Sequence, residues 1–514
     1  MPQPKDKTIA EKYFYITTTL PYVNGDPHLG HAMEFVRADV IARYKKLAGF
    51  DVFFNTGTDE HGQKLFDEAK NAGKPVQEYV DEHAEQFKLL IKALNLSPDV
   101  HFIRTTEDRH KKTAQAFWKI CKERGFIYKK NYKMKYCVGC ELEKQDSELV
   151  NGRCPLHPNK EIELVDEENY FFKFSAFQKP LLDLYAKYAD FVTPVSRYNE
   201  IKAFVERGLE DFSVSRLARK MSWGVPVPDD PEHVMYVWFD ALTSYISTLG
   251  WPGEMHSVEK EAGTAMNDFE KFWVHGTPVQ YCGKDNLRQQ SAMWQSMLMA
   301  ARFPNSRHIV INGFITGEGG VRMSKSLGNG VDPFALIEEY GTDAFRYYML
   351  REISPFEDSP FTMDAFKNAY NAGLANGLGN LVSRVVKMAE TNGVRLDTAD
   401  IKIDIEINAD ETARSMKAAE LLSPYADYFD HFEINKVCDE IWKKIAAADK
   451  FIQENEPFKK VKSDSAAGKA DIAYLLGEVS TIGLMLSPIM PETSQKIATA
   501  LHDNKITAPL FLRK

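Results

Sequence analysis

The chain has 514 residues, of which 44 % are hydrophobic and 27 % charged, a composition that excludes disordered, fibrous and disulfide-dense proteins. At about 150 residues per domain, this length predicts roughly three domains. The formal charge of −9 means that any contact with nucleic acid must use local basic surface. The sequence contains no signal-peptide core and no stretch of about 18 apolar residues. We therefore expect a cytoplasmic protein with no membrane contact.

The first predicted element is a strand that ends in a loop. Residues 13–19 are aromatic and β-branched, and residues 20–25 are rich in turn formers, which indicates a strand followed by a turn. A helix is expected next. Asp26 is a suitable N-cap, Pro27 suits the first helical position, and apolar residues recur at helical spacing from Leu29 onward.

Two histidines stand at the start of this predicted helix, in the sequence HLGH. His28 and His31 are three positions apart and therefore share one face of the helix. Backbone N–H groups and the positive end of the helix dipole favour a phosphate there, and Gly30 lets a ligand approach the backbone closely. The pattern predicts an anion site, although two exposed surface histidines would leave the same pattern.

A second strand is predicted at the apolar run Val52, Phe53 and Phe54. The stretch TGTDEHG follows it and places Asp59 just beyond the strand end, which is where open α/β sheets bind ligands. The alternative interpretation is an aspartate that only caps a helix.

A cysteine-rich stretch begins at Cys137. Cys137 and Cys140 form a Cys-x2-Cys pair, and Cys154 and His157 form a Cys-x2-His pair thirteen residues later. Two close pairs of soft ligands can build a tetrahedral zinc site. Because four protein ligands leave no open position for water, we predict one structural zinc ion per chain. A redox dithiol or incidental thiols are the alternatives, but neither accounts for the second pair.

Another strand is predicted at residues 308–316, before a glycine-rich loop and the basic sequence RMSKS. Glycines on both sides would let this segment close over a ligand and reopen. Lys325 is a mobile point charge suited to a polyphosphate. A solvated basic surface loop is the alternative. The glycines are Gly317, Gly319, Gly320, Gly328 and Gly330.

The remainder of the chain is predicted to be helical. Strand-like runs stop near Asp364, and long segments with apolar residues at helical spacing predict a helical bundle. Asn380 and Arg384 are four positions apart on one predicted helix, so both could reach exposed base edges. Phe458 stands beside a run of lysines, and its ring could stack on a base. Ordinary helix surface or core is the alternative for each residue alone.

Together these motifs resemble a known family. HLGH after an early strand and RMSKS late in an α/β fold match the HIGH and KMSKS signatures of class I aminoacyl-tRNA synthetases. Further stretches make the chain similar to methionyl-tRNA synthetases from Tyr13 to beyond Phe458. The resemblance implies an α/β Rossmann-type parallel-sheet catalytic domain, interrupted by a zinc-bearing connective peptide and followed by an α-helical anticodon-binding bundle. The stretches are TTTLPYVNGDPHLGH, NTGTDEHGQK, YVWFDALTSY, YCGKDN and RMSKSLGN.

The resemblance implies that a methionine carboxylate attacks the α-phosphorus of ATP, and that the resulting adenylate donates methionine to the 3' end of tRNA(Met). No covalent enzyme intermediate is needed, so positioned donors and positive charge should supply the catalysis. By resemblance these are His28, His31 and Lys325, with Mg2+ arriving on ATP. Arg322 replaces the first lysine of the usual motif, which keeps the charge but changes its shape. The other ATP-binding positions implied are Gly30, Gly283 and Asp285.

The resemblance also implies a methionine pocket in which Asp59 binds the ammonium. Aromatic walls suit the thioether, because sulfur is polarizable and packs well against rings. The spacing of Trp238, Ala241 and Tyr245 predicts one face of a helix. Family members often carry Phe-His where this chain has Gln289-Gln290, so the pocket floor departs from the family. The other positions implied are Leu20, Tyr22, Leu242 and Gln290.

For tRNA, the resemblance implies that Asn380, Arg384 and Phe458 read the CAU anticodon, although family members commonly have tryptophan at the position of Phe458. Because the sequence ends soon after the predicted bundle, we expect no appended dimerisation module and therefore a monomer. The expected partners are tRNA(Met), ATP and L-methionine.

The expected domain boundaries follow from the same resemblance. Residues 1–124 and 235–330 form the two halves of the catalytic domain, and residues 125–234 form the connective peptide with its zinc knuckle. Residues 331–363 form a stem-contact region linked to the KMSKS loop, and residues 364–514 form the anticodon-binding domain.

Three other functions compete with this interpretation. A class I synthetase for another amino acid would use the same nucleotide chemistry, but the insertion at residues 125–234 is too small for the editing domain of enzymes that select aliphatic side chains. A noncatalytic tRNA-binding paralogue would keep the helical bundle without activating an amino acid. A small-molecule nucleotidyltransferase would have little use for a zinc knuckle and a long helical tail.

Overall fold

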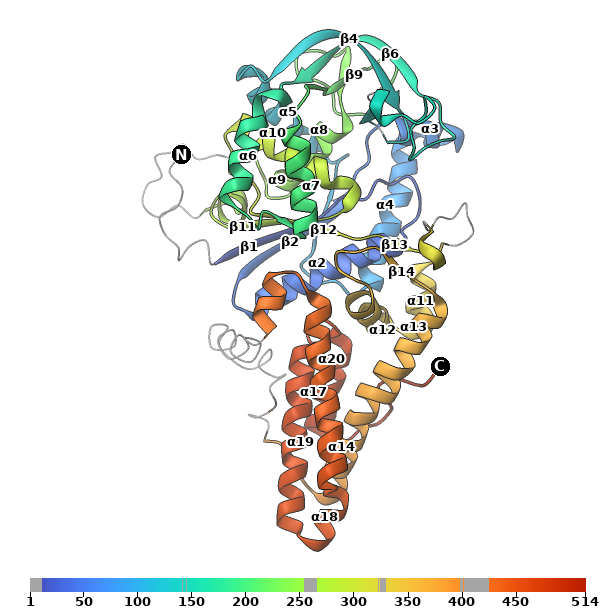
Figure 1. Cartoon of the computed structure of the whole chain (residues 1–514), viewed down its shortest axis with the longest axis vertical. Coiled ribbons are helices and arrows are strands. Elements are labelled where there is room, and N and C mark those ends of the chain that lie inside the picture. Colours follow the sequence, from blue (N-terminus) through green and yellow to red (C-terminus); the bar gives the residue numbers. More distant parts are fainter. Residues whose placement is uncertain are drawn as a thin grey trace. The chain divides into compact units, whose positions relative to one another are not determined.

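A computed structural model of the chain describes residues 12–140, 142–144, 146–253, 266–321, 323, 330–397, 401 and 425–514, and Figure 1 shows its ribbon. The chain divides into two compact units, each described here by itself. The sheet unit comprises Met1–Pro27, Phe53–Leu90 and Asp99–Ile311, and the helical unit comprises His28–Val52, Ile91–Pro98 and Asn312–Lys514.

The sheet unit is built on a sheet with the strand order β3-β2-β1-β11-β12-β7. Strands β1 and β11 are parallel neighbours, as are β2 and β3, and β12 and β7. The strand order reverses at β1, and in such sheets ligands bind at the carboxyl ends of the strands beside the reversal. The predicted strands at residues 13–19 and 52–54 and the α/β fold class are confirmed. The strands are β1 (Tyr13–Thr18), β2 (Asp51–Thr58), β3 (His101–Arg104), β7 (Val192–Thr193), β11 (Thr277–Gly283) and β12 (His308–Asn312).

Helices accompany this sheet (Figure 1), and aromatic side chains pack in its core. Tyr15 of β1 meets the ring of Trp273 edge-on at 6.0 Å between ring centroids, and Trp118 meets Phe239 at 5.2 Å. Large rings in these geometries bury much apolar surface and stabilise the core. The helices are α3 (Gln63–Asn71), α4 (Val76–Ala93), α5 (Asp108–Glu123), α6 (Gln178–Lys187), α7 (Val195–Glu206), α8 (Val237–Leu242), α9 (Ser244–Ser247) and α10 (Trp294–Ala301).

A second, antiparallel sheet with the order β5-β4-β6-β8 is inserted between α5 and α8. Its two long strands pair from Ile127 opposite Phe172 to Tyr136 opposite Glu163. This insertion falls within the range expected for the connective peptide. Its strands are β4 (Ile127–Cys137), β5 (Leu142–Glu143), β6 (Glu163–Phe172) and β8 (Phe212–Ser213), and the adjoining pair is β9 (Ser215–Leu217) with β10 (His233–Met235).

The helical unit has a bundle in which α14, α17 and α20 pack against α19 (Figure 1). Buried apolar residues of α17, including Val437, Ile441 and Ile445, recur at helical spacing, so the predicted helical bundle is confirmed. None of the described helices is long and apolar enough to cross a bilayer. The helices are α2 (Leu29–Leu47), α11 (Pro333–Tyr340), α12 (Thr342–Tyr347), α13 (Met363–Ala369), α14 (Asn380–Asn392), α17 (Ile434–Asn455), α18 (Pro457–Ser463), α19 (Ser465–Leu486) and α20 (Pro491–Asp503).

A buried ion network fixes α2 within this unit. The Asp39 carboxylate of α2 accepts hydrogen bonds from Arg346 Nη2 and Arg43 Nε, both at 2.8 Å. Arg346, on α12, also donates to the carbonyl of Ile489 at 2.8 Å. Burial alone would raise the pKa of Asp39, but the two guanidinium groups hold it below its usual value. The network therefore joins α2, α12 and the segment that precedes α20.

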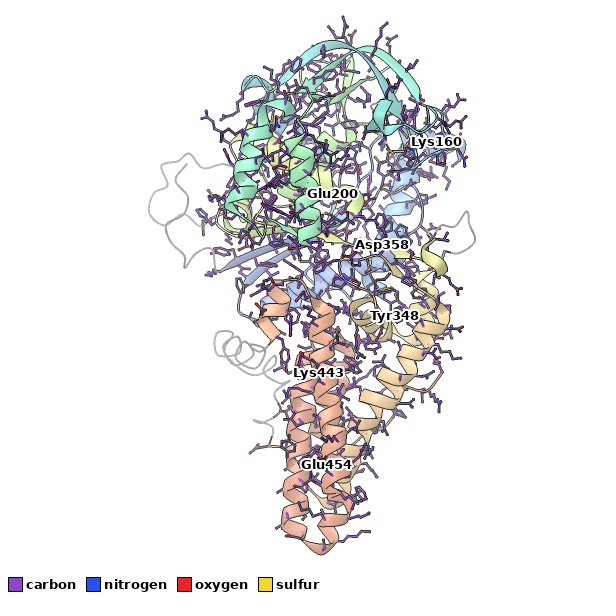
Figure 2. All side chains as sticks on the ribbon, in the orientation of Figure 1. Lys160, Glu200, Tyr348, Asp358, Lys443 and Glu454 are labelled. Carbon is purple, nitrogen blue, oxygen red and sulfur yellow. The ribbon has the colours of Figure 1, made fainter. Side chains whose placement is uncertain are left out.

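Two short strands pair within the segment Asn312–Lys514 of this unit. β13 (Ile315–Thr316) pairs in parallel with β14 (Ser359–Pro360). Asp358 accepts a hydrogen bond from the backbone N–H of Phe314 at 2.9 Å, and Tyr348 packs against two phenylalanine rings (Asp358 and Tyr348 are labelled in Figure 2). The strand pairing and the Asp358 bond hold the segment that leads toward RMSKS.

The strand predicted at residues 308–316 is broken in the structure. β12 ends at Asn312, and β13 starts three residues later at Ile315. Gly313 lies in the break, and a Cβ added there would stand 2.2 Å from the carbonyl oxygen of Glu357. The prediction of one continuous strand is wrong because the backbone at Gly313 passes close to another segment and changes its pairing partner.

Replacing Arg346 by Met should lower the free energy of unfolding of the helical unit by about 3–5 kcal/mol, because the buried Asp39 carboxylate loses a principal partner. Urea unfolding followed by circular dichroism measures this change. Lys443→Met is the control, since Lys443 pairs with Glu440 on the exposed surface of α17 (Figure 2) and its loss should leave the unfolding midpoint unchanged. Equal midpoints for the two variants would contradict the proposed importance of the network.

Candidate functional site

The loop after β1 and the segment after β2 run side by side in the sheet unit. Tyr22 and Asp59 form a parallel bridge, in which Asp59 N–H donates to the carbonyl of Pro21 at 2.9 Å and the Asp59 carbonyl accepts from Val23 N–H at 3.3 Å. Asp59 is buried, as is Leu20 in the loop after β1. Three residues predicted to bind methionine are thus gathered at the carboxyl edge of the sheet.

The residue after Asp59 is held rigidly. Arg104 donates to both oxygens of the Glu60 carboxylate, at 2.6 and 2.9 Å, and the Thr58 hydroxyl donates to it at 2.5 Å. The indole N–H of Trp223 donates to the Glu60 carbonyl at 2.6 Å. Bidentate pairs between Arg and a carboxylate are strong and directional, so the backbone at Asp59 is fixed from its C-terminal side.

The short helices α8 and α9 carry the residues predicted to form the aromatic wall. Only Thr243 separates α8 from α9, and it keeps a right-handed helical backbone with φ −72° and ψ −12°, so the predicted helical segment is interrupted by a single turn residue. The Thr243 hydroxyl donates to the carbonyl of Asp240 at 2.7 Å, a local bond that competes with a regular helix. Tyr15 of β1 donates to the carbonyl of Tyr245 at 2.9 Å and anchors α9 to the sheet. The wall residues are Trp238, Ala241, Leu242 and Tyr245.

Gln290, at the predicted pocket floor, belongs to a buried chain of hydrogen bonds. Its Nε2 donates to the hydroxyl of Tyr245 at 2.6 Å, and its Oε1 accepts from Gln280 Nε2 at 2.6 Å. The Ser306 hydroxyl donates to Gln280 Oε1 in turn. Such a connected network gives each amide one orientation. The donor end of the Gln290 amide is therefore directed at Tyr245.

Gly283 and Asp285 follow β11, the strand beside β1. Gly283 is the last residue of β11, and Asp285 is exposed on the single helical turn that follows. The backbone N–H of Thr19 donates to the carbonyl of Tyr281 at 3.0 Å, so the chain segments that leave β1 and β11 emerge at the same edge of the sheet. These two predicted ATP-binding residues therefore lie on the same edge as Tyr22 and Asp59.

In the helical unit, His28 and His31 cap the N-terminus of α2. His28 Nδ1 accepts from the backbone N–H groups of Gly30 and His31 at 3.1 and 3.4 Å, and His31 Nδ1 accepts from the backbone N–H of His28 at 3.4 Å. The two rings stack with their centroids 3.6 Å apart. The prediction of Asp26 as the N-cap is wrong, because His28 takes that position and the helix begins at Leu29.

This reciprocal capping determines where the imidazoles carry their protons. A nitrogen that accepts a hydrogen bond has no proton, so a neutral ring capped through Nδ1 carries its proton on Nε2 and can donate it to a ligand. Burial and, second, the neighbouring His28 lower the pKa of His31 well below its ordinary value of 6.5. His31 is therefore a neutral hydrogen-bond donor near pH 7.

The glycine-rich segment before RMSKS makes a tight turn. Gly319 and Gly320 have φ angles of 73° and 79°, a left-handed conformation that glycine adopts at little cost. The N–H of Gly317 donates to the carbonyl of Val321 at 2.7 Å and closes the turn. The predicted ATP-binding residues Arg322 and Lys325 lie outside the described residues.

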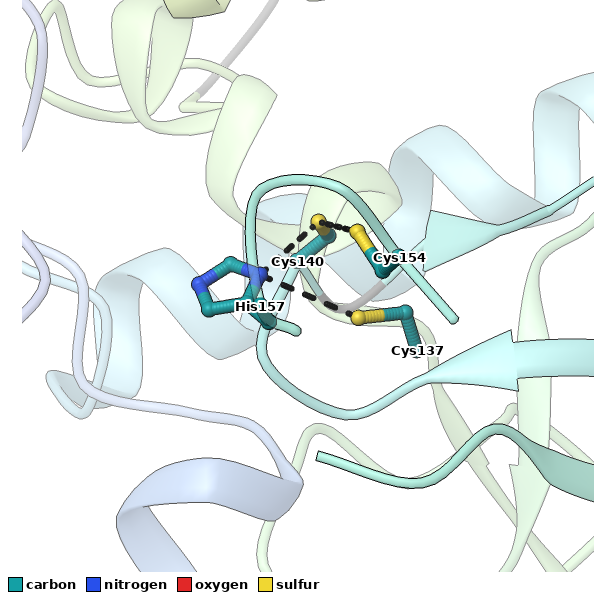
Figure 3. A group of neighbouring side chains, drawn as sticks. All are labelled: Cys137, Cys140, Cys154 and His157. Carbon is teal, nitrogen blue, oxygen red and sulfur yellow. Dashed lines mark hydrogen bonds between the residues drawn. The ribbon is translucent and has the colours of Figure 1, made fainter. Parts of the chain in front are cut away.

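Cys137, Cys140, Cys154 and His157 converge on one point (Figure 3), and their ligand atoms all lie within 4.8 Å of one another. The Cys140 sulfur is 3.4 Å from the Cys154 sulfur and 3.2 Å from His157 Nδ1, which is 3.8 Å from the Cys137 sulfur. Sulfur ligands of a tetrahedral zinc ion stand about 3.8 Å apart, because Zn–S bonds are about 2.3 Å long. The four side chains can therefore hold a tetrahedral metal ion.

The backbone around this cluster is shaped to bring the two ligand pairs together. Cys137 ends β4, and the N–H of His157 donates to the carbonyl of Cys154 at 3.0 Å, which closes the second pair into a turn. A Cβ added at Gly139 would lie 2.5 Å from Cγ of His157. Glycine at this position therefore makes room for the imidazole ring.

The residues predicted to read the anticodon lie on the bundle of the helical unit. Asn380 is exposed at the start of α14, and Arg384, one turn later, donates to Asp449 of α17 at 3.1 Å. Phe458, on α18, is 43 % exposed, so its ring is accessible to a base. Two of the lysines beside it pair with carboxylates, so the predicted local positive charge is partly neutralised.

Sequence reasoning missed a buried cluster of Asp240, His61 and His110. One oxygen of the Asp240 carboxylate lies 2.7 Å from His61 Nδ1 and the other lies 2.6 Å from His110 Nε2. The signal available was an acidic residue inside the apolar run VWFDAL, since a carboxylate among core residues must find hydrogen-bond donors.

Comparison with known proteins agrees with this architecture. Residues 14–163 and 145–386 match the family model of tRNA synthetases class I (M), and residues 404–510 match that of the anticodon binding domain of methionyl tRNA ligase. The chain is thus a class I aminoacyl-tRNA synthetase. It is 40 % identical over 489 residues to the methionine–tRNA ligase of Thermosynechococcus vestitus, covering 94 % of this chain and 89 % of that protein. The chain belongs to the methionyl-tRNA synthetase family.

Other relatives agree with this placement. The methionine–tRNA ligase of Thermotoga maritima is 39 % identical, with 94 % of this chain and 74 % of that protein covered. The structure of Mycobacterium tuberculosis methionyl-tRNA synthetase in complex with methionyl-adenylate has a TM-score of 0.83 and 34 % identity, covering 95 % of this chain and 93 % of that one. Membership of this family argues against a synthetase for another amino acid and against a small-molecule nucleotidyltransferase.

Replacing Gly139 by Ala should reduce the metal content of the purified chain well below the expected value of about one ion per chain, because the methyl group displaces the His157 ligand. Inductively coupled plasma mass spectrometry measures the metal directly. Gly477→Ala is the matched control, since a Cβ there meets no atom within 4 Å. Full metal content in the Gly139 variant would contradict the assignment of His157 as a ligand.

The His31 ring should stay neutral between pH 8 and pH 6.5, which is the ordinary pKa of a histidine side chain. Its pKa in the folded chain lies below that of the unfolded chain, so the neutral ring stabilises the fold above pH 6.5 and this contribution is lost as the pH falls further. Nitrogen-15 NMR of the labelled histidines follows each ring, and His31→Asn identifies the signal. A midpoint for His31 at or above the ordinary value would show the expectation to be wrong.

Proposed function

We propose that the chain activates L-methionine with ATP to give methionyl-adenylate and pyrophosphate, and then transfers methionine to the 3' end of tRNA(Met). Membership of the methionyl-tRNA synthetase family supports this activity. The observation that carries the proposal is the pairing of Tyr22 with Asp59 at the sheet edge, on a segment that is hydrogen-bonded through His61 to helix α8. A carboxylate suited to an ammonium group is thereby joined to a wall of rings suited to a thioether.

In the proposed methionine site, the Asp59 carboxylate binds the substrate ammonium. Its burial supports this role, since a carboxylate removed from bulk water gains most from a specific cationic partner. Trp238 and Tyr245 face the thioether, and Gln290 orients Tyr245 through the bond to its hydroxyl. The site is completed by Leu20, Tyr22, Ala241 and Leu242.

In the proposed activation step, negative charge grows on the phosphate oxygens as the methionine carboxylate attacks the α-phosphorus. His28 and His31 donate hydrogen bonds from Nε2 to these oxygens, and the N-terminus of α2 adds the positive end of its dipole. Lys325 and Arg322 neutralise the departing pyrophosphate, with Mg2+ accompanying ATP as its counter-ion. Gly30 lets the phosphates approach the backbone, and Gly283 and Asp285 bind the adenosine part.

The metal cluster is proposed to hold one structural zinc ion. The sulfur and nitrogen donors suit zinc, and four protein ligands leave no coordination position for a substrate. When bound, the ion supplies folding energy to the knuckle. Cys137, Cys140, Cys154 and His157 would therefore set the shape of the connective peptide and take no part in the chemical step.

For tRNA(Met), we propose that Asn380, Arg384 and Phe458 contact the anticodon, and that the domains have the boundaries given above, with residues 364–514 as the anticodon-binding part. The exposure of Phe458 supports base stacking. We also propose that the chain acts as a monomer, which light scattering after gel filtration tests. A cytoplasmic location accompanies the proposed role in charging tRNA for translation.

The test of this function is ATP–pyrophosphate exchange by the purified chain with methionine, leucine and cysteine in turn. Methionine alone should support exchange at low substrate concentration, and a tRNA(Met) transcript should then be charged. Lys325→Ala should lower the exchange rate about a hundredfold, because it removes a charge that stabilises the transition state. Lys443→Met, at an exposed ion pair remote in sequence from these motifs, should retain the wild-type rate.

Two results would overturn the proposal. Exchange that depends on leucine or cysteine and not on methionine would assign another substrate. Normal binding of tRNA(Met) without any exchange would instead indicate a noncatalytic tRNA-binding protein.

A further inference from the structure

The cluster of Asp240, His61 and His110, here called the carboxylate clamp, joins three separate elements of the sheet unit. Asp240 lies on α8, His61 follows β2, and His110 lies on α5. The two carboxylate oxygens meet one imidazole each, at 2.7 and 2.6 Å. All three residues are at most 2 % exposed, so no part of the clamp is shared with bulk water.

The chemistry of the clamp requires both imidazoles. A buried carboxylate is tolerated only when donors surround it, and removal of one of the two partners leaves its charge only partly compensated. His61 donates through Nδ1 and His110 through Nε2, because each of these nitrogens faces a carboxylate oxygen. Burial alone would raise the pKa of Asp240, but the two imidazoles hold it at about 2. The carboxylate is therefore ionised near pH 7.

The clamp lies between the two parts of the proposed methionine site. Asp240 is two residues after Trp238 and directly precedes Ala241, whereas His61 is two residues after Asp59. The bridge from Tyr22 and the bonds of Glu60 already fix the backbone near Asp59. The bond from His61 to Asp240 then fixes that backbone relative to α8.

We infer that Asp240, with His61 and His110, is a positioning residue for methionine recognition, because the clamp sets the distance between the ammonium-binding carboxylate of Asp59 and the wall that carries Trp238. This inference rests on the proposed function. In this role Asp240, His61 and His110 act through neighbouring residues and do not contact the substrate. A displacement of about 1 Å between binding groups can cost about a hundredfold in rate or affinity, so a small loosening of the clamp is sufficient to weaken methionine binding.

A structural role alone would give a different result from a positioning role. Loss of general stability would affect methionine and ATP alike, whereas a shift between Asp59 and α8 affects the amino acid alone. Asp240→Asn is the informative variant, because an amide can accept from one imidazole and donate to the other after a change of tautomer. The fold is thereby kept while the charge that holds both rings is lost.

The experiment measures the steady-state constants of ATP–pyrophosphate exchange for Asp240→Asn. The KM for methionine should rise about tenfold or more, while kcat and the KM for ATP stay within about threefold. Asp230→Asn is the matched control. Asp230 also bonds to a histidine, His233 at 3.1 Å, as well as to Tyr170 and Lys129, but none of these bonds reaches α8 or the segment of Asp59.

A double-mutant cycle with Asp59→Asn provides the readout that a stability effect would not move. If Asp240 acts through Asp59, the second substitution should add less than about threefold to the KM for methionine once Asp59 is lost. In the control cycle, Asp230→Asn should leave the KM for methionine unchanged with or without Asp59. Full multiplication of the effects of Asp240→Asn and Asp59→Asn would overturn the inference.

A second pair of variants keeps the inference testable if Asp240→Asn does not fold. His61→Asn retains a donor one atom beyond Cγ, as in the imidazole Nδ1, whereas His61→Leu removes it. The asparagine variant should keep a KM for methionine near that of the wild type, and the leucine variant should raise it about tenfold. Equal values for the two variants would overturn the inference, whereas absence of methionine-dependent exchange in the wild type would overturn the proposed function itself.

Discussion

A carboxylate without access to water must be surrounded by hydrogen-bond donors, and Asp240 meets this requirement with imidazoles from two other elements. Asp39 provides a second example, held by the guanidinium groups of Arg346 and Arg43. Desolvation of such a charge is offset only while every partner stays in place. Each carboxylate therefore holds the elements that carry its partners in fixed positions relative to one another. Trp238 and Ala241, which are proposed to bind methionine, lie close to Asp240 in the sequence. Asp39 fixes helix α2, which begins directly after His28.

Charge is distributed among the proposed binding groups according to the charge of the substrates. The ammonium of methionine would meet a single buried carboxylate, whereas the phosphates of ATP would meet two imidazoles that cap a helix, of which His31 is neutral near pH 7. A neutral donor gives direction without the desolvation cost of a buried cation. Full positive charge is left to Lys325 and Arg322 of the RMSKS sequence. In this proposed arrangement the residues of the HLGH sequence would position the nucleotide and the basic residues would complete the neutralisation.

Local patterns in the sequence predicted much of this structure. The strand at residues 13–19, the helical bundle and the cluster of Cys137, Cys140, Cys154 and His157 follow from composition and spacing within short segments. The errors arose where a distant or unusual partner decides the outcome. His28 replaces Asp26 as the N-cap because it exchanges bonds with His31, and the strand predicted at residues 308–316 breaks at Gly313, where the backbone passes close to Glu357. Asp240 finds its partners 179 and 130 positions away, a pairing that no local pattern in a single sequence reveals.

The most direct measurement is a crystal structure of the chain with bound methionine. The proposed mechanism predicts that the ammonium lies within hydrogen-bond distance of the Asp59 carboxylate and that the thioether lies against Trp238 and Tyr245, with Asp240 still bonded to both imidazoles. Methionine bound elsewhere, or bound here with its ammonium directed away from Asp59, would contradict it.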